Sequence, residues 1–120
     1  HLTLRRLPVN IQIYGAAKCF ATKKAERYFK ERRIKYQYID LKRYGLSKGE
    51  LAVLKEAVGL ESLFKRDCLE YKRLRLDEIR SSSVREEILL KNPELYRTPL
   101  VRNGRHATVG YDPSVWKDWK

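Results

Sequence analysis

Residues 9–32 read VNIQIYGAAKCFATKKAERYFKER, and this stretch decides the fold. Apolar and polar residues alternate from Val9 to Tyr14, which predicts a strand with one buried face. The small residues at 15–17 end that strand. Apolar residues then recur at helical spacing over 20–32 and form one stripe. Alternation resumes over 34–41 and predicts a second strand, parallel to the first if the helix between them is a crossover.

Two capping boxes predict helices in the middle of the chain, because each pairs a serine with a glutamate three residues later. The predicted helices are 48–58, after Ser47 with Glu50, and 84–91, after Ser83 with Glu86. Gly59 and the pair Asn92-Pro93 end them. Residues 60–76 carry apolar residues at helical spacing and are expected to form short pieces joined by loop.

A hairpin and a terminal helix are predicted after residue 97. Two short strands, 98–102 and 105–110, flank the turn Asn103-Gly104, which is a strong hairpin signal. Asp112 is the expected cap of the last helix, and Pro113 takes its first position. The apolar face of that helix consists of Val115, Trp116 and Trp119.

The element order is β-α-β, then helices, then a β-hairpin, then a helix. This is the order of a thioredoxin-like fold, an α/β (α+β) fold with a mixed sheet, with helices inserted between its halves. We expect a single domain over 9–120, with the helical insertion at about 46–92. Residues 1–8 precede the first periodic segment, and we expect them to be flexible or derived from a tag.

Cys19 is the candidate catalytic residue, because it lies between a strand-ending turn and the start of a helix. Free backbone N–H groups and the helix dipole favour a negative charge there, so they favour the nucleophilic thiolate. Lys18 and Lys23 add positive charge nearby, and the hydroxyl of Thr22 is placed to donate a hydrogen bond to the sulfur. The alternative reading is a buried structural cysteine.

A dithiol motif would need a cysteine at position 22, so an intrahelical disulfide cannot form. A redox cycle must then be resolved by Cys68, by a thiol of another protein, or by a small thiol such as glutathione. Cys68 lies on an apolar arc with Phe64 and Tyr71, which favours a packing role. His106 is expected to be a surface residue.

The pair Thr98-Pro99 opens a predicted strand, where a proline is permitted because no ladder donor is needed. In thioredoxin folds the corresponding bond is cis and lies against the active cysteine. A cis bond here would expose the backbone of Thr98 to a substrate, whereas a trans proline would only begin the strand.

Composition favours an anionic partner, since 27 Lys and Arg stand against 15 Asp and Glu, for a formal charge of +12. An oxyanion substrate or an acidic protein surface fits this charge. Nucleic acid is disfavoured because the basic residues form no long block. No segment resembles a membrane span or a signal peptide, and the two cysteines form no disulfide framework, so a reducing cytoplasm is expected. No metal site and no bound cofactor are predicted.

The span from Ile11 to about Trp119 resembles the arsenate reductase / Spx family. The motifs that carry this resemblance are Ile-Tyr-Gly-x-x-Lys-Cys19, the Lys-Lys-Ala helix, Ile-Asp-Leu after the second strand, Leu-Ser-Lys-x-Glu-Leu, Tyr71-Lys72-x-Leu74, Asn92-Pro93, the Pro99 strand and Val109-Gly110-Tyr111. The resemblance implies a thioredoxin fold with Cys19 as the reactive thiol.

The chain departs from the catalytic members of that family around its oxyanion site. Those members carry a histidine four residues before the cysteine and an arginine four after it, where this chain has Gly15 and Lys23. Their three oxyanion arginines match, by spacing, Lys65, Thr98, and Gly110 or Tyr111, with Arg66 and Arg97 as neighbours that would have to substitute. Lysine is a poorer bidentate clamp than arginine.

Three functions follow in order of preference. The first is a monothiol oxidoreductase with glutaredoxin-like chemistry at Cys19, with glutathione as the candidate co-substrate and Thr98-Pro99 orienting the substrate. The second is a non-catalytic, Spx-like regulator that binds an acidic protein surface such as RNA polymerase; its Cys-x-x-Cys switch is absent here. The third is a true arsenate reductase that depends on glutathione and glutaredoxin.

Overall fold

The computed structural model describes residues 10–119, so the expectation for residues 1–8 lies outside the described residues. Four strands form one sheet in the order β2-β1-β3-β4. β1 runs parallel to β2 and antiparallel to β3, and β3 pairs antiparallel with β4. The elements are β1 Ile11–Gly15, α1 Phe20–Glu31, β2 Tyr36–Asp40, α2 Leu41–Tyr44, α3 Lys48–Val58, η2 Glu61–Leu63, α4 Leu69–Arg73, η3 Leu76–Glu78, α5 Ser82–Lys91, η4 Pro93–Leu95, β3 Leu100–Asn103, β4 His106–Val109 and α6 Pro113–Trp116.

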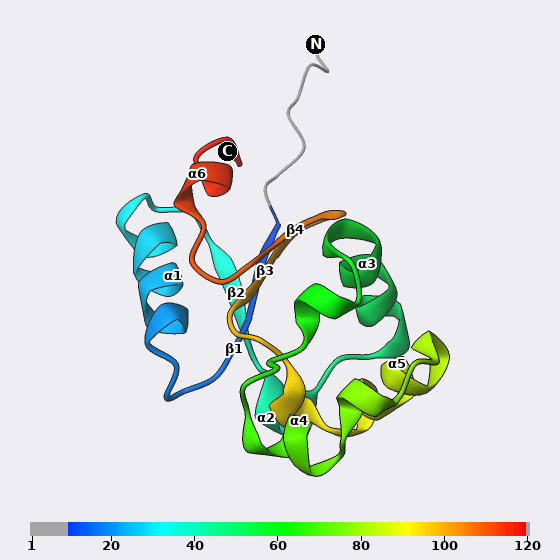
Figure 1. Cartoon of the computed structure of the whole chain (residues 1–120). Coiled ribbons are helices and arrows are strands. Elements are labelled where there is room, and N and C mark those ends of the chain that lie inside the picture. The colour runs from blue at the N-terminus through cyan, green and yellow to red at the C-terminus, as the bar shows by residue number, and fades with distance from the viewer. Residues whose placement is uncertain (1–9, 120) are drawn as a thin grey trace.

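The sheet lies between two helical layers, with α1 and α6 on one side and α3 to α5 on the other (Figure 1). Alternate residues of the central strands serve the two sides. Ile13 and Val101 pack with Phe29 and Trp116 under α1 and α6, whereas Tyr14 and Leu100 belong to the larger apolar cluster under the inserted helices. The predicted order of elements and the mixed sheet are confirmed.

Local signals placed most element ends correctly. Ser47 and Glu50 form the predicted capping box, with both reciprocal hydrogen bonds present, and Gly59 ends α3 at φ +86°. Pro113 takes the first position of α6 as predicted. The side chain of Asp112 does not cap that helix, however, because it accepts a hydrogen bond from the hydroxyl of Ser114 at 2.8 Å.

Three further local predictions were wrong. The second capping box does not form, since Ser81 rather than Ser83 caps α5 and accepts the N–H of Val84. The predicted second strand ends at Asp40, whose carboxylate caps the short helix α2. In the hairpin, Asn103 pairs with His106, so the turn residues are Gly104-Arg105, one position later than predicted. Gly104 has a φ of +64°, as a two-residue hairpin turn of type II′ requires at its first position.

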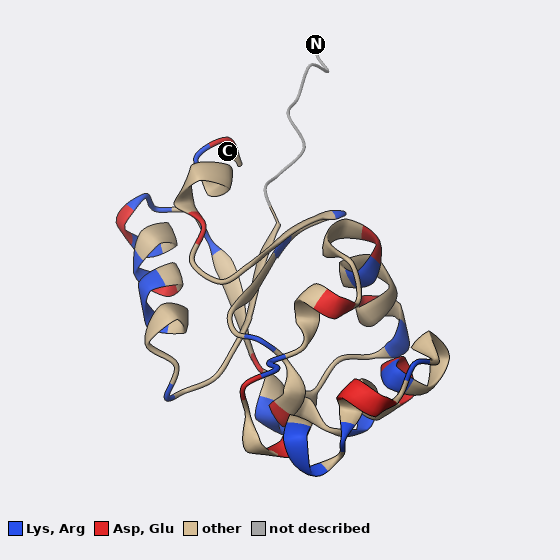
Figure 2. Ribbon diagram, viewed as in Figure 1, with Lys and Arg blue, Asp and Glu red and all other residues tan. Residues whose placement is uncertain are grey.

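Charged residues are spread over both helical layers (Figure 2). Lysine and arginine are dense on α1 and on the turn that leads from α1 into β2, whereas the inserted helices mix both signs. The described part of the chain has no helix long and apolar enough to cross a bilayer.

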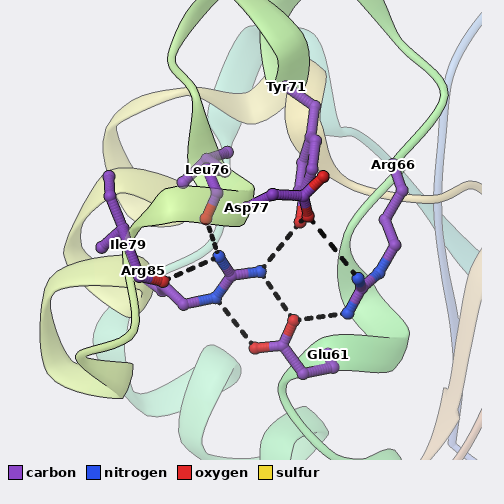
Figure 3. Close-up of polar contacts among 7 residues, drawn as sticks. All are labelled: Glu61, Arg66, Tyr71, Leu76, Asp77, Ile79 and Arg85. Carbon is purple, nitrogen blue, oxygen red and sulfur yellow. Dashed lines mark hydrogen bonds and ion pairs between the residues drawn. The ribbon is translucent and has the colours of Figure 1, made fainter.

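The inserted helices are held together by the buried guanidinium of Arg85 (Figure 3). It donates to both carboxylate oxygens of Glu61, at 2.7 and 3.0 Å, and to the hydroxyl of Tyr71 at 3.1 Å. It also donates to the carbonyl oxygens of Leu76 and of Ile79. One side chain therefore joins η2, α4, η3 and the segment after η3, as buried charges require when they lose water.

Candidate functional site

Cys19 occupies the N-cap position of α1, with an extended backbone at φ −86° and ψ 116°. Its N–H donates to the carbonyl oxygen of Ala16 at 3.0 Å, which fixes the turn between β1 and the helix. Its side chain is half-buried and makes no capping bond to the helix. The sulfur therefore lies at the positive end of α1, as the sequence predicts.

Hydrogen bonding sets the acidity of this thiol. Burial of the sulfur raises the pKa of Cys19. Hydrogen bonds with the side chains of Thr22 and Thr98, and with the backbone N–H groups of Thr22 and Ala21, lower this pKa, and together they outweigh the effect of burial. The net pKa lies below its ordinary value, because each of these bonds is stronger to the thiolate than to the thiol.

The orientation of Thr22 depends on Gly15. The hydroxyl oxygen of Thr22 accepts the N–H of Ala16 at 3.4 Å, which leaves its proton free for the sulfur. A Cβ at position 15 would lie 2.4 Å from Cγ2 and 2.8 Å from Oγ1 of Thr22. Gly15 thus leaves the space that Thr22 fills.

Thr98-Pro99 forms the second wall of the site. The peptide bond between them is cis, and the Cys19 thiol donates to the carbonyl oxygen of Thr98 at an Sγ–O distance of 3.6 Å. The carbonyl oxygen of Pro99 accepts the N–H of Gly110 at 2.8 Å, which anchors this loop to the end of β4. The structure thus brings Cys19, Thr22 and Thr98-Pro99 together.

The two lysines beside the cysteine are both exposed. Neither Lys18 nor Lys23 is among the causes that lower the pKa of Cys19, which are all hydrogen bonds. Support of the thiolate by these lysines therefore stays a prediction.

The basic residues expected near the substrate lie on two segments that run side by side. Phe64 and Tyr96 form an isolated antiparallel bridge, and Arg97 donates its N–H to Leu63 at 2.8 Å. The bridge brings Lys65 and Arg97 to one hollow, which is lined by Glu61, Phe64, Lys65, Arg66, Asp67 and Arg97. Arg66 forms an ion pair at 2.8 Å with Glu61, a carboxylate that it shares with Arg85, and Arg97 directly precedes Thr98.

Cys68 and His106 lie in settings that differ from that of Cys19. Cys68 is a free thiol that caps α4, where its sulfur accepts the N–H of Tyr71 at 3.4 Å, and it packs against the larger apolar cluster. His106 is exposed on β4. Within residues 10–119, no three His, Cys, Asp or Glu side chains gather in a way that could hold a metal ion.

Two aromatic residues near the thiol were missed by sequence reasoning. Phe20 follows Cys19 directly and is 76% exposed. Tyr38 lies on the α1 face of β2; burial raises its pKa, and the charges of Asp40, Glu26 and Cys19 add to that effect. The alternation of Tyr36 and Tyr38 indicated that both lie on one face of a strand. It did not indicate that Tyr38 lies near Cys19, because that depends on how β2 and α1 pack.

The model of the ArsC family matches residues 14–119, which is most of the chain and includes every residue of the site described above. The chain belongs to the ArsC family. The resemblance expected from the sequence is therefore confirmed at the level of the family.

Relatives of this ArsC-family chain carry different names. It is 29% identical to the global transcriptional regulator Spx 2 of Oceanobacillus iheyensis, over 93% of this chain and 94% of that protein. It superposes on an arsenate reductase from Vibrio cholerae with a TM-score of 0.84 at 20% identity, covering 95% of this chain and 100% of the other. An arsenate reductase related protein from Brucella melitensis gives a TM-score of 0.68 at 23% identity, covering 92% and 93%. The structural likeness supports the thioredoxin-like fold.

Proposed function

We propose that this ArsC-family protein is a monothiol oxidoreductase in which Cys19 is the nucleophile. The observation that carries the proposal is the setting of the sulfur, between the hydroxyl of Thr22 and the carbonyl of Thr98 at the N-terminus of α1. Hydrogen bonds from the side chains of Thr22 and Thr98 and from the backbone N–H groups of Ala21 and Thr22 lower the pKa of Cys19, and the thiolate is the form that disulfide exchange requires.

The reaction begins when the Cys19 thiolate attacks one sulfur of a disulfide. The new S–S bond forms as the old one breaks, and the departing sulfur leaves with the electron pair as a thiolate. Because position 22 is Thr22, no second thiol on α1 resolves the mixed disulfide. Glutathione, as the co-substrate, attacks the substrate sulfur of the mixed disulfide as its thiolate; a disulfide between glutathione and the substrate forms, and Cys19 leaves with the electron pair as a thiolate. The backbone of Thr98 orients the substrate beside the sulfur.

A test is to incubate the Cys68→Ser variant with glutathione disulfide and follow the mixed disulfide by intact mass. We expect one glutathione per chain, lost on addition of reduced glutathione, and no adduct in a Cys19→Ser, Cys68→Ser double variant. An adduct that forms no faster on Cys19 than on a free cysteine peptide at pH 7 would contradict the proposal.

A second candidate is a regulator that binds an acidic protein surface such as RNA polymerase. It is supported by the formal charge of +12 and by the relative named as a transcriptional regulator. A pull-down against polymerase subunits tests it: binding that survives Cys19→Ser favours the regulator, and no binding at low salt removes it. Both candidates imply a reducing, cytoplasmic setting.

Arsenate reduction is the weakest candidate because the expected oxyanion arginines are replaced. Lys65 and Arg97 line the nearby hollow, but Arg66 is paired with Glu61. The test is to incubate the chain with arsenate, glutathione and glutaredoxin and to measure arsenite. An arsenate reductase should form arsenite, and Lys65→Ala should slow that reaction. No arsenite above background would remove this candidate.

A further inference from the structure

β2 is an edge strand of the sheet, and its outer edge is unpaired within residues 10–119. In the order β2-β1-β3-β4 it pairs with β1 on its inner side, and no strand among residues 10–119 pairs with its outer side. An outer strand presents unpaired N–H and C=O groups to any extended segment that approaches it. The central residues Gln37 and Tyr38 are exposed, so those groups are reachable.

Apolar and aromatic side chains line both faces of β2. Tyr36 packs against the cluster under α1, and Tyr38 follows it on the same face. Ile39 packs against the larger cluster on the opposite face. A strand added at the outer edge would place alternate side chains beside these residues, so its affinity would not depend on backbone bonds alone.

Positive charge surrounds the first half of this edge. Lys30, Arg33 and Lys35, with Ile34 and Tyr36, line a hollow of about 450 Å³ at the start of β2. Lys42 and Arg43 follow the strand at its other end. Figure 2 shows the same concentration of lysine and arginine on α1 and the turn into β2.

Within residues 10–119, none of Lys30, Arg33 and Lys35 forms an ion pair with a carboxylate. Glu26 accepts a hydrogen bond from the hydroxyl of Tyr36 at 2.9 Å, and Asp40 accepts the N–H of Lys42 at 3.1 Å as the cap of α2. Glu31, at the end of α1, lies with Lys24, Arg27 and Arg32 at a separate hollow beside Tyr111. A second copy of this chain would bring like charges together along the edge, whereas an acidic strand would not.

We propose that the outer edge of β2 binds an extended acidic segment of a partner protein, which joins the sheet as a fifth strand with its carboxylates facing Lys30, Arg33 and Lys35. Backbone hydrogen bonds supply affinity in such strand addition, and the charges select the partner. The proposal goes beyond the thiol chemistry and does not depend on Cys19.

The test uses a labelled peptide of alternating glutamate and valine, titrated into the full chain and followed by fluorescence anisotropy and by amide NMR. We expect binding that weakens with salt, and protection of alternate β2 amides, those that face away from β1. A peptide of alternating lysine and valine should not bind. Neither should one of alternating glutamate and proline, because its prolines hold it in a polyproline II conformation that does not match a strand edge.

Charge reversal locates the surface. Lys30→Glu with Lys35→Glu should weaken peptide binding at least tenfold. Lys48→Glu with Lys72→Glu makes the same change of net charge on exposed positions of α3 and α4, across the sheet, and should leave binding within about twofold. Circular dichroism of both variants checks folding, and amide mapping on the unmodified chain decides the matter if the first variant unfolds.

Several results would overturn the proposal. One is equal weakening in both double variants, and another is equal binding of the glutamate–proline peptide; either would indicate diffuse electrostatic attraction. A single-stranded oligonucleotide that shifts the β2 amides while the acidic peptide does not would assign the edge to nucleic acid. Concentration-dependent dimerisation that protects the same amides would assign it to a second copy.

Discussion

At the scale of single residues, the Thr22 hydroxyl makes the largest contribution to the lowered pKa of Cys19, and it depends on the space that Gly15 leaves for it. The Thr22 hydroxyl accepts the N–H of Ala16, and Gly15 leaves room for the side chain that carries it. The sequence showed that a hydroxyl lies three residues after the cysteine. It did not show that Gly15 and Thr22 share one space, because that contact exists only after β1 and α1 pack.

Thr22→Val keeps the shape of the side chain but removes its hydrogen bond to the sulfur. We expect the pKa of Cys19 to rise by about one unit, as loss of one hydrogen bond to a charged group implies. Thiolate absorbance at 240 nm across a pH series measures it, with Cys68→Ser as the background. An unchanged pKa would mean that Thr22 only packs.

Gly15→Ala tests the same hydroxyl by displacing the Thr22 side chain instead of replacing it. The added methyl group would lie 2.4 Å from Cγ2 of Thr22, so Thr22 must shift away. We expect a higher pKa of Cys19 and slower alkylation at pH 6.5, together with some loss of thermal stability from overpacking. Gly49→Ala, whose Cβ would meet nothing closer than 3.9 Å, is the control; it should leave the pKa and the alkylation rate of Cys19 unchanged and cause no loss of thermal stability, since alanine favours the helix α3.

At the scale of elements, caps and periodicity were readable, but interactions between distant segments were not. The capping box at Ser47 was predicted correctly because its partners are three residues apart. The Arg85 cluster was missed because Glu61 and Tyr71 reach it from 24 and 14 residues away. The displaced cap at Ser81 and the shifted hairpin turn show the limit of local signals, since neighbouring serines and turn residues compete and packing selects between them.

The two helix caps of the insertion should differ in strength. Ser47 accepts the N–H of Glu50 at 3.1 Å within a complete capping box, whereas Ser81 accepts that of Val84 at 3.4 Å without one. Ser47→Ala should cost about 1 kcal/mol of unfolding free energy and Ser81→Ala less. Urea unfolding of both variants makes the comparison, and the reverse order would contradict it.

Glu50 links this cap to pH. Burial raises the pKa of Glu50, but bonds from the backbone and side chain of Ser47 and from the hydroxyl of Tyr14 outweigh it, so its pKa lies below its ordinary value. A carboxyl whose pKa is lowered by folding stabilises the protein above its unfolded pKa, and this stability is lost as the pH falls through the folded pKa. Glu50→Gln should therefore flatten the loss of stability below about pH 4. A slope equal to that of the unmodified chain would contradict this.

At the scale of the whole molecule, the sheet separates the helix that carries Cys19 at its N-terminus from the inserted helices that Arg85 joins. The α1 and α6 side carries the helix that presents Cys19, and the inserted helices on the other side are joined by Arg85 (Figures 1 and 3). The element order and the mixed sheet could be predicted because they follow from alternation and helical spacing. The position of the basic residues relative to the thiol could not, because it depends on the bridge between Phe64 and Tyr96.

Replacing Arg85 should therefore affect the stability of the whole chain more than the thiol. Arg85→Met keeps the apolar stem but leaves two carbonyl oxygens and the Tyr71 hydroxyl without their donor. We expect a loss of about 3 kcal/mol in unfolding free energy, with the pKa of Cys19 unchanged. Arg80→Met, at an exposed position, is the control and should cost little. A loss as small as that of the control would show that the cluster does not hold the insertion.

The measurement that tests the central claim most directly is the pH dependence of Cys19 alkylation by iodoacetamide in the Cys68→Ser variant. The stabilised thiolate predicts a rate that is already near its plateau at about pH 7, with a midpoint well below that of a free cysteine peptide. A rate that rises only above about pH 8 would show an ordinary thiol and contradict the proposed chemistry.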